Sequence, residues 1–413
     1  MAVGEGLFRR NRHRGHEWSA AVKEVWPIIP LGQALEISAD RILPSTQPGA
    51  RFNYVGLEHI ESHTGRILTR DLTLGSEIKS TKNVFRPGQV LYGKLRPYLN
   101  KVHLASREGI CSTDIFVVKP NPEKVNAAFT AYYLRSPYVL SRVNDLMQGA
   151  NLPRLSPGAF LNIPIPLPPL PEQHRIVNLL DEADELRRRR EQADRRTADL
   201  IPALFYEMFG DPANKKHPFA SLSDVAEVVS GIAKGRRFNG QRTVTVPYIR
   251  VANVQAGFLE LSEIKTIEAL PAEVKDLTLK RGDVLLTEGG DFDKLGRGAL
   301  WETEIPDCIH QNHIFRVRVN DSKLIPVFFM NYLQNSFART YFLQCSKRTT
   351  NLASINMSQL RALPVPLPPV ALQRQFAARV AEIRALQARQ AESRRRLDDL
   401  FQSMLHRAFQ GEL

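Results

Sequence analysis

Two long segments of the chain carry apolar residues at the alternating three- and four-residue spacing of a helix that packs along one side. In residues 172–209 one heptad series includes Ile176, Ala183 and Leu204, and a parallel series adds further leucines. Residues 372–409 show the same spacing. The matching positions of the second segment are Phe376, Ile383, Leu397 and Met404. This spacing over about five heptads predicts two helices that form a coiled coil, each a rod of roughly 57 Å at the helical rise per residue.

The two helices are predicted to pair with each other, because they have equal length and belong to one chain. Two equal halves fused head to tail would be related by a pseudo-twofold axis, so the pair is expected to be antiparallel. Both ends of each helix are apolar, whereas the middles are polar, at Arg190 and Gln390. Pro202 lies near the end of the first helix and is expected to kink it, since proline lacks the backbone N–H.

The chain repeats itself with a period near 200 residues. Ile163–Pro169 recurs as Leu363–Pro369, and seven of the twenty residues in 151–170 are identical 200 positions later. Weaker matches lie upstream, where Thr113–Val118 resembles Asn312–Val317. A period of this length indicates a duplicated domain rather than a solenoid. The two copies diverge most between these anchors, which favours two related but non-identical ligands.

Each copy begins with a globular part that is rich in short β-type segments and ends with a long helix. The predicted fold class is therefore α+β, with two similar β-rich domains joined by two long helices that form an antiparallel coiled coil. The proline runs before each helix favour stiff extended backbone, as a strut or as a peptide ligand; their presence at matching places favours the strut. The predicted parts are an N-terminal tail (1–24), a first β-rich domain (25–168), a central helix that acts as a spacer (169–210), a second β-rich domain (211–367) and a C-terminal helix (368–413).

The formal net charge of +13 and the pI of about 9.7 favour a polyanionic partner, because cationic side chains release the counterions condensed on nucleic acid. A merely basic protein is the alternative. The arginine runs 187–190 and 394–396 would contact phosphate or an acidic partner, or form solvated helix faces. Three separated cysteines without a C-x-x-C pair disfavour disulfides and cysteine-based zinc sites and fit a cytoplasmic setting. No segment predicts a secretory signal or a bilayer-spanning helix.

Signatures of catalysis are missing from the chain. It has no phosphate-binding G-x-x-x-x-G-K-[ST] loop. His310 and His313 would point to opposite faces of a strand, so no metal site is predicted. The segment 211–214, Asp-Pro-Ala-Asn, is predicted to be a turn rather than a methyltransferase loop. The E-x-K spacings at Glu77 and Glu263 lack a suitably placed aspartate. These absences disfavour a nuclease or methyltransferase, and the basic charge with two divergent domains disfavours a pure coiled-coil scaffold.

Several phrases of the sequence together resemble the specificity subunits of type I restriction-modification enzymes. The resemblance runs from residue 25 onward, and the N-terminal 24 residues lie outside it. It departs from the family at Pro369–Gln373, which lacks the Pro-Glu pair, and around Thr287–Arg297, where a second K-x-R-P loop is missing. The phrases are Trp26–Gly32, the K-x-R-P loop within Gly93–Lys101, the helix start Leu167–Gln173 and the helix end Met208–Pro212.

The resemblance implies that each β-rich domain is a target-recognition domain reading one half of a bipartite, asymmetric site on double-stranded DNA. The helices would be a ruler that fixes the unread gap. Two modification subunits carrying S-adenosylmethionine would methylate adenine, and restriction subunits using ATP and Mg would cut DNA. This chain itself would be non-catalytic and would bind no cofactor and no metal.

The candidate DNA-binding residues are basic, amide and tyrosine side chains of the expected reading loops. For each, the alternative is an ordinary exposed residue, or for the asparagines a turn residue. The candidates are Tyr92, Lys94, Arg96, Tyr98, Lys101, Asn151 and Arg154 in the first domain, and Lys234, Arg236, Arg237, Lys294, Arg297, Lys347, Arg348 and Asn351 in the second.

Overall fold

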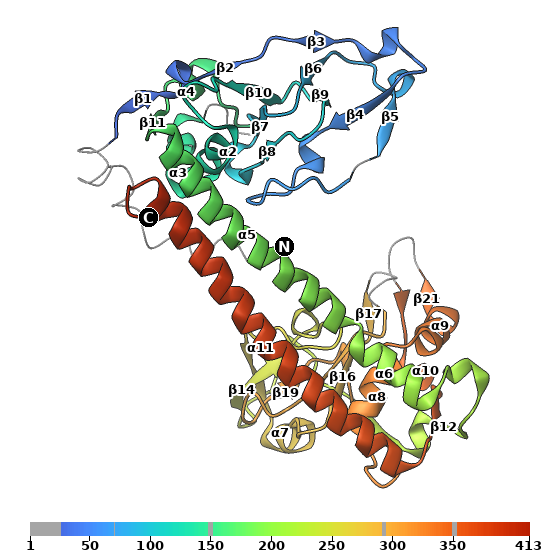
Figure 1. The fold of residues 1–413 in the computed structure, drawn as a ribbon. Coiled ribbons are helices and arrows are strands. Elements are labelled where there is room, and N and C mark those ends of the chain that lie inside the picture. The colour runs from blue at the N-terminus through green and yellow to red at the C-terminus, as the bar shows by residue number, and fades with distance from the viewer. Residues whose placement is uncertain (1–25, 70, 148–151, 291–294, 349–352) are drawn as a thin grey trace. The chain divides into compact units, whose positions relative to one another are not determined.

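The computed structural model describes the chain except for residues 1–25, 70, 148–151, 291–294 and 349–352. It contains two compact units (Figure 1). The first combines the chain up to Glu191 with Glu392–Leu413, and the second is Gln192–Ala391. Each unit therefore holds one β-rich domain together with about half of each long helix.

The first domain has a two-stranded ribbon, a four-stranded sheet in the order β2-β10-β7-β8 and a five-stranded sheet in the order β3-β6-β9-β4-β5. Its strands are β1 (Ile28–Pro30), β2 (Leu35–Ile37), β3 (Arg41–Ile42), β4 (Arg51–Val55), β5 (Leu72–Leu74), β6 (Lys82–Phe85), β7 (Val90–Gly93), β8 (Val102–Leu104), β9 (Gly109–Cys111), β10 (Ile115–Pro120) and β11 (Pro164–Pro166). Its helices are α2 (Ala127–Arg135), α3 (Pro137–Leu146) and α4 (Pro157–Leu161).

The second domain has a corresponding ribbon and a four-stranded sheet in the order β13-β20-β16-β18, with two three-stranded sheets beside them. Its strands are β12 (Phe219–Ser221), β13 (Ala226–Ser230), β14 (Val244–Ile249), β15 (Lys265–Ala269), β16 (Val284–Thr287), β17 (Gly289–Gly290), β18 (Gly298–Leu300), β19 (Ile309–His310), β20 (Ile314–Val319), β21 (Lys347–Arg348), β22 (Ala353–Ser354) and β23 (Pro364–Pro366). Its helices are α7 (Pro271–Leu277), α8 (Pro326–Leu333), α9 (Ser336–Cys345) and α10 (Met357–Arg361).

The repeat seen in the sequence is a repeat of topology and register. In the ribbons, β1 pairs with β11 as β12 pairs with β23, all antiparallel. In the four-stranded sheets, Ile115 lies opposite Gly93 just as Ile314 lies opposite Thr287. Both domains also contain a parallel pair, β4 with β9 and β14 with β19. Positions in the two domains can therefore be equated strand by strand.

The long helices are α5 (Leu170–Ala198), which is followed by the shorter α6 (Leu200–Phe209), and α11 (Val370–Ala408). The helix break at Asp199 confirms the interruption expected from Pro202, whose ring nitrogen has no hydrogen to donate to the carbonyl of Ala198. The corresponding stretch of α11 has no proline and is continuous.

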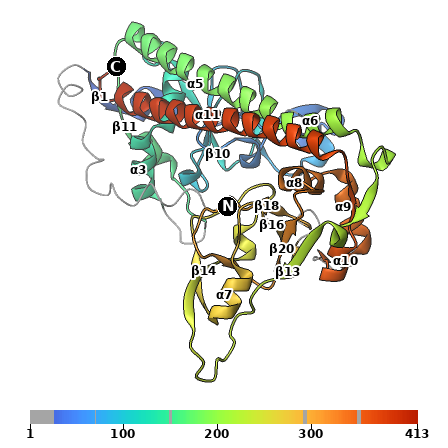
Figure 2. The same cartoon turned by 90° about the horizontal axis from the view of Figure 1, so that it is seen from below.

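The helices pair in an antiparallel sense within each unit (Figures 1 and 2). In the first unit Arg187 Nε donates to Asp398 Oδ1 at 2.7 Å. In the second unit Thr197 Oγ1 donates to Gln390 Oε1 at 2.7 Å, and the ring of Phe205 lies 5.8 Å from that of Phe376. Facing residue numbers rise on one helix as they fall on the other, so the α+β class with two similar β-rich domains and an antiparallel helix pair is confirmed.

Both ends of the helix pair are parts of the domain cores. In the first unit Phe401, Leu405 and Phe409 of α11 belong to the buried cluster of the first domain. The Phe409 ring lies 5.2 Å from that of Phe129 and 5.1 Å from that of Tyr133. In the second unit the core contains the matching residues of α6 and α11: Leu204, Phe205, Phe209, Phe376 and Val380.

The middle of the helix pair carries no buried core. Between Asp184 and Leu204 of α5 and α6, none of the described residues is buried. The same holds between Val380 and Phe401 of α11. The predicted polar middles are thus confirmed, and half-buried polar pairs such as Arg187–Asp398 replace apolar packing there.

A buried glutamine fastens each long helix to its own domain. Gln173, with no exposed surface, accepts a hydrogen bond from Asn126 N at 2.8 Å and donates to Lys124 O and Pro168 O at 2.9 and 2.8 Å. Gln373 makes the same three contacts with Ile325 N, Lys323 O and Pro368 O. The three hydrogen bonds of each glutamine join the first turn of the long helix to the domain and so fix where the helix leaves it. Both copies contain the same contacts.

Replacing Gln173 by alanine should destabilise the first unit by about 3 kcal/mol, because it removes three buried hydrogen bonds and leaves Asn126 N without its partner. Denaturant unfolding of the purified chain measures the loss. The matched control is Gln402→Ala on the exposed surface of α11, which should change stability by less than about 0.5 kcal/mol. Equal effects of the two substitutions would contradict the role assigned to Gln173.

Candidate nucleic-acid interface

The loop after β7 is held rigidly by backbone hydrogen bonds. Lys94 N donates to Asp114 O at 3.0 Å, Leu155 N donates to Lys94 O at 3.0 Å, and Arg96 N donates to Pro153 O at 2.8 Å. Arg96 has a left-handed backbone with a φ of 49°, which is uncommon for a residue with a side chain and persists where the surroundings impose it. The loop thereby presents two exposed candidates, Arg96 and Tyr98, from a fixed backbone.

Three charged residues, Lys94, Asp114 and Arg154, are neighbours along the backbone at the base of this loop. Lys94 Nζ lies 5.2 Å from the centre of the Phe116 ring, a cation–π contact. Arg154 lies next to Lys94, because the backbone of Arg154 forms an antiparallel β-bridge with Leu95. A guanidinium nitrogen of Arg154 is 3.6 Å from Asp114 Oδ1. The sequence-predicted residues Lys94, Arg96 and Arg154 are thus brought together.

Two candidates of the first domain have structural roles instead. Tyr92 is 3% exposed, and its ring packs 4.9 Å from that of Phe160. Burial raises the pKa of its phenol, and the side chain cannot reach DNA without unpacking the sheet, so the prediction for Tyr92 does not fit the structure. Lys101 is half-buried and its Nζ donates to Leu57 O at 2.6 Å.

In the second domain the candidates Lys234, Arg236 and Arg237 lie on the exposed segment after β13. Arg236 makes a two-pronged ion pair with Glu273 at 2.5 and 2.6 Å, and Lys234 Nζ lies 5.7 Å from the Tyr248 ring centre. Glu273 holds Arg236 in place and neutralises part of its charge, so Lys234 and Arg237 carry most of the free positive charge of this segment.

Arg297 occupies the position in the second domain that Lys101 has in the first. The carbonyl of Arg297 accepts from Thr287 N, as that of Lys101 accepts from Gly93 N. Arg297 is half-buried and donates to Gln255 Oε1 at 3.0 Å. Lys347 and Arg348 form β21. Asn151, Lys294 and Asn351 lie outside the described residues, as do the side chains of Lys347 and Arg348.

The search for basic side chains missed Glu288 and His313, which face each other with 2.6 Å between Glu288 Oε2 and His313 Nδ1. Glu288 takes the place of Lys94, and His313 takes that of Asp114, since Glu288 N donates to His313 O at 3.0 Å. The signal was present in the repeat, where 113–118 matches 312–317.

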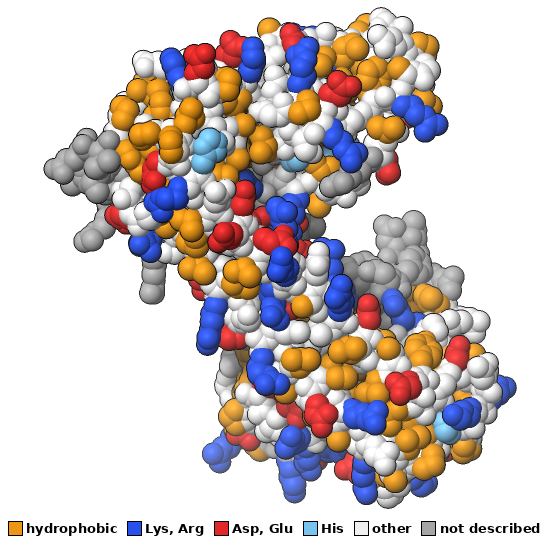
Figure 3. All heavy atoms as spheres, in the orientation of Figure 1, with side chains coloured by type: hydrophobic (Ala, Val, Ile, Leu, Met, Phe, Trp, Pro, Cys, Tyr) orange, Lys and Arg blue, Asp and Glu red, His pale blue; other side chains and the backbone are white. Residues whose placement is uncertain are grey.

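The arginine runs of the long helices are largely paired with acids of the same helix. Arg189 contacts Glu185 at 2.9 Å, and Arg396 contacts Glu392 at 3.0 Å. Both arginines are more than two-thirds exposed. This arrangement supports the interpretation as solvated helix faces. Figure 3 shows Lys and Arg interspersed with Asp and Glu over the visible face.

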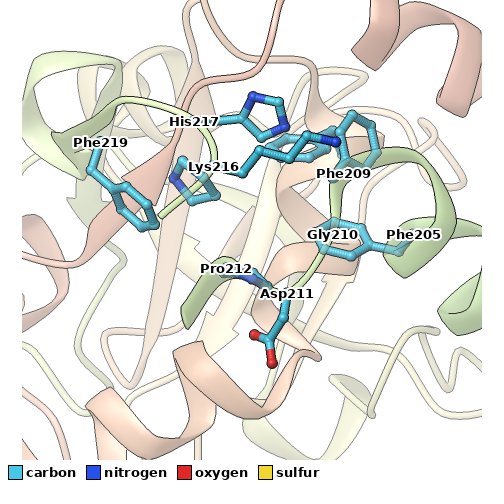
Figure 4. Close-up of a pocket in the computed structure, with 10 residues that line it drawn as sticks. Phe205, Phe209, Gly210, Asp211, Pro212, Lys216, His217 and Phe219 are labelled. Atoms are coloured by element: carbon cyan, nitrogen blue, oxygen red, sulfur yellow. The ribbon is translucent and has the colours of Figure 1, made fainter. Parts of the chain in front are cut away.

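The segment after α6 forms a turn, as predicted. Asp211 accepts from Ala213 N at 2.9 Å and begins a short 3-10 helix, Pro212–Asn214. A small pocket lies here against Phe205, Phe209 and neighbouring residues (Figure 4). Its lining is mainly the aromatic packing that joins α6 to the second domain, so the pocket is part of that junction.

The described residues contain no group of three or more histidine, cysteine or acidic side chains that could hold a metal. His310 is completely buried, and desolvation lowers its pKa to about 4. It is therefore a neutral core residue whose Nδ1 lies 3.0 Å from Ile314 O. In the described part of the chain, no helix combines the length and apolarity needed to cross a membrane.

A duplicated β-rich domain carried on paired helices defines the class of two-domain DNA-specificity proteins. The family model for the type I restriction modification DNA specificity domain matches residues 64–193 and again 214–390. The chain belongs to this family, and its predicted identity as the DNA-specificity subunit of a type I restriction-modification system, which recognises DNA and is not itself catalytic, is confirmed.

Individual relatives are specificity subunits of the same family, and a solved structure shares the fold. The chain is similar to the type I restriction enzyme EcoKI specificity subunit of Escherichia coli K12, with 27% identity over 327 residues that cover 73% of this chain and 69% of the relative. The StySPI specificity subunit of Salmonella potsdam is 25% identical over 324 residues, again 73% and 69%. A chain in a structure described as "Structural basis underlying complex assembly and conformational transition of the type I R-M system" shares the fold, with a TM-score of 0.64, 23% identity and coverage of 96% and 100%.

Proposed function

We propose that this chain reads a bipartite, asymmetric site on double-stranded DNA, one half with each β-rich domain. The observation that carries the proposal is one scaffold with two different sets of loop residues. Lys94 and Arg96 follow β7, whereas Glu288 and Gly290 take the same places after β16. Equal scaffolds with unequal side chains fit two unlike half-sites, since base edges are read by side chains in the grooves.

The helix pair would set the unread gap between the half-sites. Two readers in one chain bind one DNA molecule with the second contact effectively intramolecular, provided that the spacing between them matches the site. The candidate residues Lys94, Arg96, Tyr98 and Arg154 in the first domain, with Lys234 and Arg237 in the second, supply the contacts. The positive charge of the chain adds non-specific attraction to phosphate.

Exposed leucines occur at equivalent positions of the two repeats on the helices, as expected for binding two copies of one partner. Leu186 and Leu400 are about half exposed beside the Arg187–Asp398 pair of the first unit. Leu200 and Leu386 are about two-fifths exposed in the second unit. Leu186 and Leu386 are equivalent in the repeat. We assign these two matching patches to two modification subunits.

The partner subunits would supply all the chemistry of the complex. The modification subunits would bind S-adenosylmethionine and methylate adenine, and the restriction subunits would use ATP and Mg to cut DNA. This chain would bind none of these cofactors. We place its action in the cytoplasm.

Methylation-sensitive long-read sequencing of the source organism tests the proposal. We expect adenine methylation at one motif made of two defined parts separated by a gap of fixed length. Deleting the gene for this chain should abolish methylation at that motif alone. A methylated motif without a gap, or methylation that persists after the deletion, would contradict the proposal.

A binding measurement separates the proposal from a pure scaffold. The purified chain is titrated with double-stranded DNA at several salt concentrations, alone and with the modification subunits. We expect binding that weakens steeply as salt rises, because phosphate contacts release counterions. A scaffold without a reading function would bind DNA in neither condition.

A further inference from the structure

One position is held in the same way in both domains but carries opposite charge. Lys94 and Glu288 each follow the last residue of a central strand, β7 and β16. Their backbone N–H groups donate to Asp114 O and His313 O, both at 3.0 Å. Their carbonyls accept from the equivalent residues Leu155 N and Ile355 N, at 3.0 and 2.9 Å.

The neighbours of this position are also exchanged between the domains. In the first domain Lys94 is accompanied by Asp114 and Arg154, whose charged groups lie 3.6 Å apart. In the second domain Glu288 contacts His313 at 2.6 Å, and the residue equivalent to Arg154 is Ser354. The first domain therefore presents cations here, whereas the second presents a carboxylate beside an imidazole.

The difference fixes what each side chain can recognise. An ammonium group only donates hydrogen bonds, and an ionised carboxylate only accepts them. In the major groove, guanine presents the acceptors O6 and N7, and cytosine presents an amino group. We propose that this equivalent position is a base-reading position in both domains, at which Lys94 selects guanine and Glu288 selects cytosine. The inference rests on the proposed function, since it takes DNA reading by both domains as given.

The carboxylate argues for a base rather than the DNA backbone as the ligand. A phosphate repels a carboxylate, so a position that faced phosphate could not carry Glu288 in one of two equivalent scaffolds. Sequence-independent contacts come from Lys, Arg and neutral donors. A hydrogen-bond donor on a base edge is the DNA group that a carboxylate can bind.

Both side chains are accessible and partly immobilised, as readers need to be. Lys94 is half-buried over the Phe116 ring, and the Glu288 side chain is 35% exposed. His313 Nδ1 lies 2.6 Å from Glu288 Oε2, and this contact orients the carboxylate. Fixing a side chain before binding lowers the ordering cost of the contact.

Glutamine substitutions test the inference in the full chain assembled with its modification subunits. Glutamine pairs with adenine through N6 and N7. We expect Lys94→Gln to change one base pair of one half-site from guanine to adenine, with a preference shift of about tenfold or more, and Glu288→Gln to change one base pair of the other half-site from cytosine to adenine. Long-read sequencing of a methylated plasmid library that contains randomised half-sites gives both motifs.

Matched controls use an exposed ion pair on the four-stranded sheet of the first domain. Lys119 and Glu36 lie 2.8 Å apart, and both are more than half exposed. Lys119→Gln and Glu36→Gln should leave the motif unchanged. Lys94→Arg and Glu288→Asp keep the donor and acceptor character and should retain the original bases. If a glutamine variant unfolds, these two conservative variants carry the test, and a changed base preference in either would overturn the inference.

Two results with folded glutamine variants would overturn the inference. One is an unchanged motif, and the other is a uniform loss of methylation over all sequences, which indicates a phosphate or structural role. Failure of the proposed function looks different, because the unmodified chain would then yield no two-part motif at all.

Discussion

Lengthening both long helices by four residues is expected to widen the unread gap of the methylated site by about two base pairs. Four residues add about 6 Å to a helix, and successive base pairs of a duplex are about 3.4 Å apart. The insertions follow Ala193 and Ala391, within the stretch where no described helix residue is buried. The Arg187–Asp398 pair of the first unit and the Thr197–Gln390 pair of the second are each left intact.

The gap length is read directly from the methylated motif. The same four residues inserted after Thr303, in an exposed loop of the second domain, control for the effect of added length alone and should leave the gap as it is. If the helix insertions yield a folded chain that methylates sites with the original gap, the helices do not set the spacing.

Exchanging residues 25–168 for the corresponding domain of another family member should replace one half of the recognised site and leave the other half and the gap unchanged. The reason is that each β-rich domain has its own sheets and its own buried cluster. The donor must keep aromatic residues at Phe129 and Tyr133, because both pack against Phe409 of α11.

Sequencing of methylated sites again gives the result. The reciprocal exchange of residues 211–367 serves as the matched control and should change only the other half. A change in both halves after a single exchange would mean that the two domains do not read independently.

The architecture was accessible from sequence because it depends on periodic signals. The heptad patterns around Ile176 and Phe376 predicted two helices, and both residues are buried in the structure. The interruption near Pro202 followed from the missing N–H of proline. The matching proline segments fixed the two ribbon strands β11 and β23 at equivalent places. Each of these inferences needs only neighbours along the chain or a repeated pattern.

The site was less accessible because exposure depends on partners that are distant in sequence. Tyr92 stands next to the K-x-R-P loop in sequence and was therefore expected to face DNA, but it lies in the sheet with its ring against Phe160. Arg236 is an ordinary basic residue in sequence, whereas its charge is met by Glu273. Glu288 was overlooked because a search for cations excludes carboxylates, although its backbone contacts match those of Lys94.

The division of the helices between the two units has a consequence for how the chain matures on the ribosome. The first unit needs Phe401, Leu405 and Phe409 to close its core, whereas the second is one continuous stretch, Gln192–Ala391. Domains usually complete their folding in the order of synthesis. Here the later-made unit can finish first, and the earlier-made one keeps apolar surface open until the last helix has emerged. We therefore expect chaperones to bind the nascent chain during this interval.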